Sequence, residues 1–321
     1  MRKFKDYTPA GVIPATLLAL NDDFSIDEKA SRKHLRDCAL VPGVSAVTVN
    51  GHASEVHACT LEEQERILAF SVDEVGDDVP LINGVYTESS FEAVRIAKMA
   101  DRNGASALLV FPPASMSMGG QLRPEMALRH FSMIAEATDL PIIAFQYPAG
   151  GGLGYPFDTL IKLFETVPTI KAIKDWSNDA MLHEKHIRTF QNLSRPVNVL
   201  TTHSSWLMAS LTMGANGLLS GAGSVIADLQ VALFQAIKSG DLVKAQAVND
   251  RIYPLAQAFY APPFLDMHNR MKEMLVLLGR LDKAVVRPPL MKLPEAEIRK
   301  LQQAIDLAGI GRDGAFAQAA E

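Results

Sequence analysis

One lysine of this sequence stands where a buried strand would not be expected to carry a charge. Lys174 ends the stretch TIKAIK (169–174), whose apolar residues are typical of an interior strand of a parallel sheet. A buried ammonium is costly without a partner, so such a lysine reaches solvent, pairs with a carboxylate such as Glu55, or loses its proton. A neutral amine can attack a ketone and form a Schiff base, which then acts as an electron sink. We therefore treat Lys174 as the first candidate catalytic residue.

Three further residues that can transfer protons stand at the ends of similar apolar runs. His52 follows VSAVTVN, Tyr147 ends PIIAFQY and His203 follows VNVLTT. Histidine titrates near neutral pH and suits a general acid or base. Taken singly, each of these side chains is at least as well explained by a hydrogen bond to loop backbone or by aromatic packing. Their role in catalysis depends on whether the fold brings them to Lys174.

Eight short apolar runs alternate with helical patterns along most of the chain. The runs cover residues 11–20, 44–50, 79–85, 105–111, 141–147, 169–174, 197–202 and 217–220. Strands that each precede a helix form a parallel sheet, and eight such units in succession predict a (β/α)8 TIM barrel. A doubly wound sheet is the alternative, but the turn after the first run, LALNDDFS, lacks the glycine-rich phosphate fingerprint. In a barrel, the candidate residues at the ends of the runs would all face one mouth.

The pattern changes after Gly240. From there the sequence shows helical spacing with no strand between the helices. We therefore predict a barrel over residues 1–240, a C-terminal helical extension over 241–308 and a mobile tail over 309–321.

Composition narrows the choice of partners. The formal net charge of −5 does not favour a nucleic-acid or anionic membrane surface, so a small molecule is the expected partner. Cys38 and Cys59 have no CxxC spacing, which indicates neither a disulfide framework nor a zinc site and fits a reducing cytoplasm. No apolar run approaches the roughly 18 residues of a membrane span. Acidic residues are sparse in the predicted mouth loops, so we expect no divalent-metal site. No phosphate-binding loop is present, so we expect no nucleotide cofactor either.

Several segments in register resemble the dihydrodipicolinate synthase and N-acetylneuraminate lyase family of Schiff-base aldolases. They include GVIPATLLALNDDFSIDEKA, GVSAVTVNGHASEVHACTLEE, AIKDWS, GANGLLS and RPPLMKLP, and the match runs from about residue 11 to about residue 305. The resemblance implies a barrel with three trailing helices and, often, a homotetramer. It also implies that Lys174 is the Schiff-base lysine, condensing with pyruvate or another 2-oxo acid without a cofactor.

The loop that holds the 2-oxo acid carboxylate departs from the family pattern. Family members usually carry GTTGE or GSTGE there, whereas this chain has GHASE over residues 51–55. Backbone amides in such a loop can still hold an anion, but the central hydroxyls are replaced by His52 and Ala53. The candidate substrate-binding residues implied by the resemblance are Gly51, Ala53, Ser54, Phe145, Ser220 and Gly221.

Other departures concern the acid–base residues and the second substrate. Phe145 stands where the family has its tyrosine, and Tyr147, two residues on, shares its face of the strand. His203 takes the place of an acidic residue of the synthases. Gly150 replaces the arginine that binds the second substrate's carboxylate, and the tyrosine pair after the fourth strand is replaced by prolines. The sequence therefore does not favour synthesis of dihydrodipicolinate itself.

Two functional hypotheses follow. The first is a metal-independent lyase in which Lys174 forms an imine and Tyr147, His52 or His203 moves protons, with carbon–carbon cleavage and dehydration both open. The second is a barrel that binds a 2-oxo acid but has lost turnover and acts as a regulator, which the substitution at Phe145 supports.

Overall fold

The barrel predicted from the sequence is confirmed in a computed structural model, which describes residue 4 and residues 6–311. Most of the predicted mobile tail, from residue 312 on, lies outside these described residues. Eight parallel strands form one sheet in the order β1-β8-β7-β6-β5-β4-β3-β2. Their bounds are β1 Gly11–Pro14, β2 Val47–Val49, β3 Leu81–Val85, β4 Ala107–Val110, β5 Ile142–Gln146, β6 Ile170–Asp175, β7 Asn198–Thr201 and β8 Gly217–Ser220.

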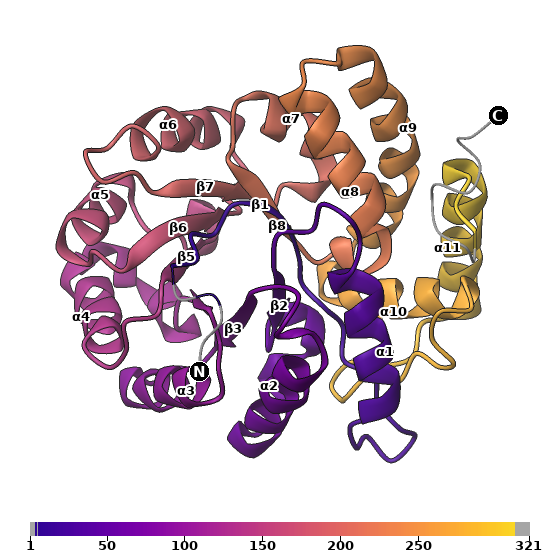
Figure 1. Cartoon of the computed structure of the whole chain (residues 1–321), viewed down its shortest axis with the longest axis horizontal. Helices are drawn as coiled ribbons and strands as arrows, with labels where there is room; N and C mark the ends of the chain where they lie inside the picture. The colour runs from indigo at the N-terminus through magenta and orange to yellow at the C-terminus, as the bar shows by residue number, and fades with distance from the viewer. Residues whose placement is uncertain (1–3, 5, 312–321) are drawn as a thin grey trace.

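The sheet closes on itself between β1 and its two neighbours. On one side β1 pairs with β8 from Gly11↔Gly217 to Pro14↔Ser220. On the other side a parallel bridge between Ala15 and Thr48 joins the end of β1 to β2. Closure leaves the sheet without free edges, and the helices surround the closed ring of strands, as Figure 1 shows.

Within the described residues, each strand is followed by a helix, and three more helices follow the eighth. The barrel helices are α1 Glu28–Ala39, α2 Leu61–Val75, α3 Ser90–Arg102, α4 Pro124–Ala135, α5 Phe157–Thr166, α6 Ala180–Phe190, α7 Leu207–Thr212 and α8 Gly223–Lys238. The later helices are α9 Leu242–Phe259, α10 Met267–Leu277 and α11 Glu295–Ala308, all within the range 241–308 of the predicted extension. In Figure 1 they lie together on the α1 and α8 side of the barrel.

The first strand is shorter than the apolar run that predicted it. The strand ends at Pro14, and the rest of the run, through Leu20, is a buried segment whose pairings are isolated bridges from Ala15 to Thr48 and from Leu20 to Ile26. Buried backbone amides need acceptors, and α1 supplies them from two polar side chains. The amide of Leu17 donates to His34 Nε2 and that of Ala19 to Ser31 Oγ, both at 3.1 Å. Apolar content alone could not distinguish this supported loop from a strand.

Among the described residues, no helix is both long enough and apolar enough to cross a lipid bilayer.

Candidate active site

Lys174 lies inside the barrel, one residue before the end of β6. It is paired in register with Phe145 of β5 and Leu200 of β7, and only 7% of its surface is exposed. Its Nζ lies 4.1 Å from the centroid of the Phe145 ring. Within the described part of the chain, no carboxylate forms an ion pair with this amine; Glu55, the alternative partner, pairs with Lys272 instead. The structural alternative of an ion pair with Glu55 therefore does not apply.

Burial sets the protonation state of this amine. Because the charged form loses its hydration inside the barrel, the pKa of Lys174 falls to about 7. At neutral pH about half of the amine is then unprotonated and able to attack a carbonyl.

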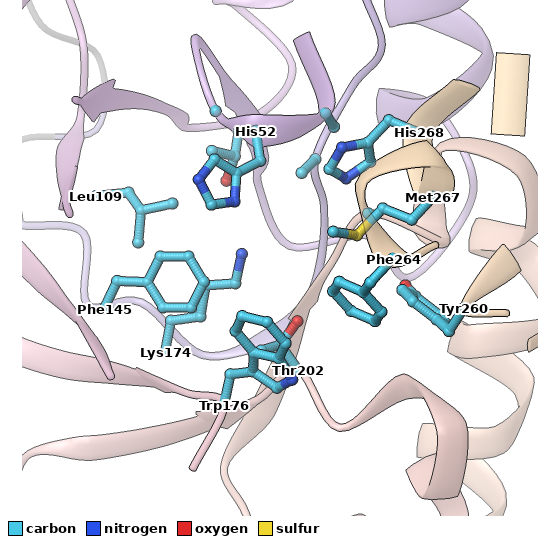
Figure 2. A pocket seen from close by; sticks show the side chains of 15 residues that line it. His52, Leu109, Phe145, Lys174, Trp176, Thr202, Tyr260, Phe264, Met267 and His268 are labelled. Carbon is cyan, nitrogen blue, oxygen red and sulfur yellow. The ribbon is translucent and has the colours of Figure 1, made fainter. Parts of the chain in front are cut away.

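A cavity of about 50 Å³ opens in front of the amine (Figure 2). The loop after β2 contributes Gly51, His52 and Ala53 to its wall, and β5 contributes Phe145. Gly221, just after β8, completes the set of sequence-predicted residues that line the cavity with Lys174. Ser54, Tyr147, His203 and Ser220, the other predicted site residues, are absent from this lining.

The loop after β2 is built as a tight turn. Asn50 and Glu55 have positive φ angles of 52° and 54° and bracket a 3-10 turn over His52–Ser54. The side chain of Asn50 holds this bend by donating to the carbonyl of Gln64 at 2.9 Å and to Asn83 Oδ1 at 2.8 Å.

The same turn decides which amides are free to bind a ligand. The amide of Gly51 donates to Ser54 Oγ at 3.0 Å, so the Ser54 hydroxyl supports the loop from within. The first amides of a helical turn, here those of His52 and Ala53, have no acceptor inside it. They are the natural donors to an anion in the cavity.

His52 and Tyr147 form a hydrogen-bonded pair. The phenol oxygen of Tyr147 lies 3.0 Å from His52 Nε2, and the Tyr147 ring packs on Phe145 with centroids 4.5 Å apart. Burial, and then the nearby Lys174, hold the pKa of His52 well below its usual value, so the imidazole is neutral. Burial also raises the pKa of Tyr147 and keeps the phenol protonated. His52 lines the cavity, and Tyr147 contacts His52 without lining the cavity itself.

His203 belongs to a different group of side chains. Its Nε2 accepts the backbone N–H of Asn178 at 3.1 Å, and its Nδ1 lies 3.1 Å from Thr201 Oγ1. Its ring packs on that of His183, with centroids 4.5 Å apart. These contacts place it behind the end of β6, where it supports the strand.

Asp175 is the centre of this buried group. Its Oδ2 accepts from Nδ1 of both His183 and His186, each at 2.8 Å, and all three side chains are fully buried. The paired histidines lie three residues apart on one face of α6, a spacing visible in the sequence, although the sequence analysis assigned them no role.

Ligand atoms of Asp175, His183 and His203 lie within 4.8 Å of one another, as in many metal sites. The lone pair of His203 Nε2, however, already accepts the Asn178 amide, and the Asp175 carboxylate accepts two imidazoles. Hydrogen bonding explains the group, and we assign it no metal.

The C-terminal extension also reaches the cavity, which the sequence analysis did not foresee. Tyr260, Phe264, Met267 and His268 all line it. Phe264 stacks on Trp176 at a centroid distance of 5.2 Å and an interplanar angle of 11°. No local pattern in the sequence distinguishes these residues, because only the packing of the extension against the barrel brings them to the mouth.

An unpaired amine of lowered pKa inside a closed barrel, next to amides that can hold an anion, is the arrangement expected of a class I aldolase-like lyase. Residues 8–308 match the sequence model of the Dihydrodipicolinate synthetase family, and the chain belongs to that family. The resemblance seen in the sequence is thereby confirmed.

Relatives of known sequence are distant. The chain is 29% identical over 301 residues to a DapA-like lyase of Halobacterium salinarum, with 94% of both chains covered. It is 29% identical over 308 residues to the 4-hydroxy-tetrahydrodipicolinate synthase of Methanopyrus kandleri, covering 95% of this chain and 98% of the relative.

Solved structures show the same fold. A prophage protein of the dihydrodipicolinic acid synthase family from Escherichia coli, crystallised with pyruvate, superposes with a TM-score of 0.85 at 24% identity, covering 94% of this chain and 98% of that one. A monomeric dihydrodipicolinate synthase variant gives a TM-score of 0.85 at 21% identity, with 96% and 99% covered.

Proposed function

We propose that this protein is a Schiff-base-forming lyase that acts on pyruvate or a related 2-oxo acid, or on a sugar acid of that class, through Lys174. The single observation that carries the proposal is the buried, unpaired amine of Lys174 in the same cavity as the Gly51–Ala53 loop. The pyruvate bound to the structural relative from Escherichia coli supports the choice of a 2-oxo acid.

Different residues of the site bind the carboxylate, attack the ketone and transfer protons in this proposal. The amides of His52 and Ala53 hold the carboxylate while the neutral Lys174 amine adds to the carbonyl carbon. The resulting carbinolamine takes up one proton from solvent and loses its hydroxyl as water, and the neutral imidazole of His52, held by Tyr147, relays the protons of this step. The product is an iminium ion that can withdraw electrons from the neighbouring carbon, C3. In this proposal Gly51 and Gly221 shape the wall, and Ser54, Ser220 and His203 support it.

Borohydride trapping with pyruvate tests the proposal. We expect reduction to leave one pyruvate-derived group on the peptide that carries Lys174, and Lys174→Met to abolish it. Lys171→Met is the matched control, because Lys171 lies on the same strand, three residues earlier, and does not line the cavity. Labelling that persists in Lys174→Met, or an unlabelled wild-type protein, would contradict the proposal.

The second hypothesis, a silent binder of 2-oxo acids, predicts a different outcome. It predicts the trapped adduct without release of product from any compound in a panel of 2-oxo acids and sugar acids. Because the relatives include 4-hydroxy-tetrahydrodipicolinate synthases, that reaction belongs in the panel. Turnover of any member rejects the silent binder and identifies cleavage, condensation or dehydration from the product.

The assembly and location implied by the family remain part of the proposal. We expect a homotetramer, which sedimentation velocity at several protein concentrations tests, and a cytoplasmic location, which cell fractionation tests.

A further inference from the structure

A second imidazole borders the cavity from the C-terminal extension. His268, on the first turn of α10, lines the same cavity as Lys174 and His52 (Figure 2). The centroids of the two imidazole rings lie 6.5 Å apart. The proposed capture of the ketone uses His52 and leaves His268 without a role.

The wall opposite α10 is shaped to admit this ring. A Cβ atom on Gly221 would lie 2.9 Å from His268 Nε2, closer than side-chain contacts allow. Glycine at this position therefore lets the imidazole approach the end of β8. This close approach is a structural reason for glycine at position 221, one of the predicted site residues.

A buried ion pair fixes α10 against the loop that carries His52. Lys272, one turn after His268, pairs with Glu55, three residues after His52, and the two side chains are 1% and 2% exposed. Glu55 also accepts the backbone N–H of Arg287 at 2.8 Å, and Lys272 donates to the carbonyl of Val285 at 2.8 Å. The pair therefore joins the helix that carries His268 to the loop that carries His52.

The imidazole of His268 is neutral at pH 7. Burial, with smaller effects of Lys174, Lys272 and His57, lowers the pKa of His268 to about 3. A neutral imidazole can accept a proton at one ring nitrogen and return it.

The expected pose of a 2-oxo acid separates the tasks of the two rings. The carboxylate carbon and C3 are attached to opposite sides of the carbonyl carbon. A substrate whose carboxylate lies on the amides of His52 and Ala53 therefore directs C3 away from that loop. Gly221 after β8 and His268 on α10 form a part of the cavity wall that is separate from this loop.

We propose that His268 is a second catalytic residue, which carries the proton at C3 of the Lys174-bound substrate. This inference rests on the proposed function. The neutral ring accepts a proton from C3 of the iminium ion; the C–H electron pair forms the C2=C3 bond, and the C=N pair moves to nitrogen to give the enamine. Return of the proton to C3 reverses the step. In cleavage, His268 accepts the hydroxyl proton on C4, the C3–C4 pair moves into the enamine, an aldehyde leaves, and the proton then passes to C3.

Exchange of the C3 hydrogens of pyruvate in D2O, followed by proton NMR, tests this step without knowledge of the second substrate. In His268→Gln we expect borohydride trapping on Lys174 within about twofold of wild type, and exchange at least roughly 100-fold slower. His57→Gln is the matched control, because His57 is an exposed histidine of the neighbouring loop, and it should change neither rate.

A second measurement guards against a folding defect. The circular dichroism spectrum and the urea denaturation midpoint of His268→Gln should match those of the wild type while exchange slows. Exchange in folded His268→Gln within about threefold of wild type would overturn the inference. Parallel loss of trapping and exchange would also overturn it, because His268 would then serve capture. An unlabelled wild-type protein would instead reject the proposed function itself.

Discussion

Breaking the buried Glu55–Lys272 pair should destabilise the protein far more than breaking a surface pair. In Lys272→Met the carboxylate of Glu55 stays buried without its cation, and removing one partner of a buried pair costs roughly 3–5 kcal/mol. We expect a loss of about 3 kcal/mol, at the lower end of that range, because Glu55 keeps its hydrogen bond from the Arg287 amide.

The matched control is Lys283→Met. Lys283 pairs with Asp22 at the surface, where the two side chains are 40% and 83% exposed, and such pairs contribute about 0–1 kcal/mol. Urea denaturation followed by circular dichroism measures both variants. The single variant Glu55→Gln and the double variant Glu55→Gln/Lys272→Met complete the cycle. The loss in the double variant should be smaller than the summed losses of Glu55→Gln and Lys272→Met by at least about 1 kcal/mol.

Lys272→Met should also lower the rate of hydrogen exchange in the substrate. Since α10 carries His268, we expect folded Lys272→Met to slow the exchange of pyruvate C3 hydrogens, whereas Lys283→Met should not. Equal denaturation midpoints for the two single variants would refute the view that the buried pair anchors α10.

Three further predictions concern the barrel itself. The rate of adduct formation with pyruvate should rise with pH through about 7, because Lys174 becomes a nucleophile as it loses its proton; a rate that is flat from pH 6 to 8 would count against the lowered pKa. Tyr147→Phe removes the hydrogen-bond partner of His52 Nε2 and should slow adduct formation by roughly tenfold without preventing it, as measured by quenched-flow trapping. An unchanged rate would show that Tyr147 does not assist this step. Asp175→Asn deprives two histidines of α6 of their charged acceptor and should destabilise the protein by about 3 kcal/mol in urea, while dialysis of the wild type against a chelator should leave both stability and trapping unchanged.

The fold could be predicted because each strand and helix has a local pattern. All eight runs contain strands in the structure, since buried parallel strands must be short and apolar and the helices between them must be amphipathic. The first run was predicted too long, because after Pro14 the continuous strand stops and the buried amides of Leu17 and Ala19 donate to side chains of α1 instead of to a neighbouring strand.

The site could be predicted only where its residues sit at strand ends. Lys174, Gly51, His52, Ala53, Phe145 and Gly221 line one cavity because parallel strands bring their C-terminal ends together. His203 was grouped with them for the same reason, yet its side chain turns toward the Asn178 amide and Thr201. A strand-end position indicates the mouth but does not give the direction of a loop side chain.

The sequence by itself determined the barrel, its trailing helices and the lysine at the end of the sixth strand, because these depend on periodicity and on a single costly charge. Only the tertiary structure decided which groups surround that lysine. The hydrogen bond of His52 with Tyr147 and the ring contact of His52 with His268 join segments 95 or more residues apart. Such contacts arise from packing between elements that no local pattern encodes.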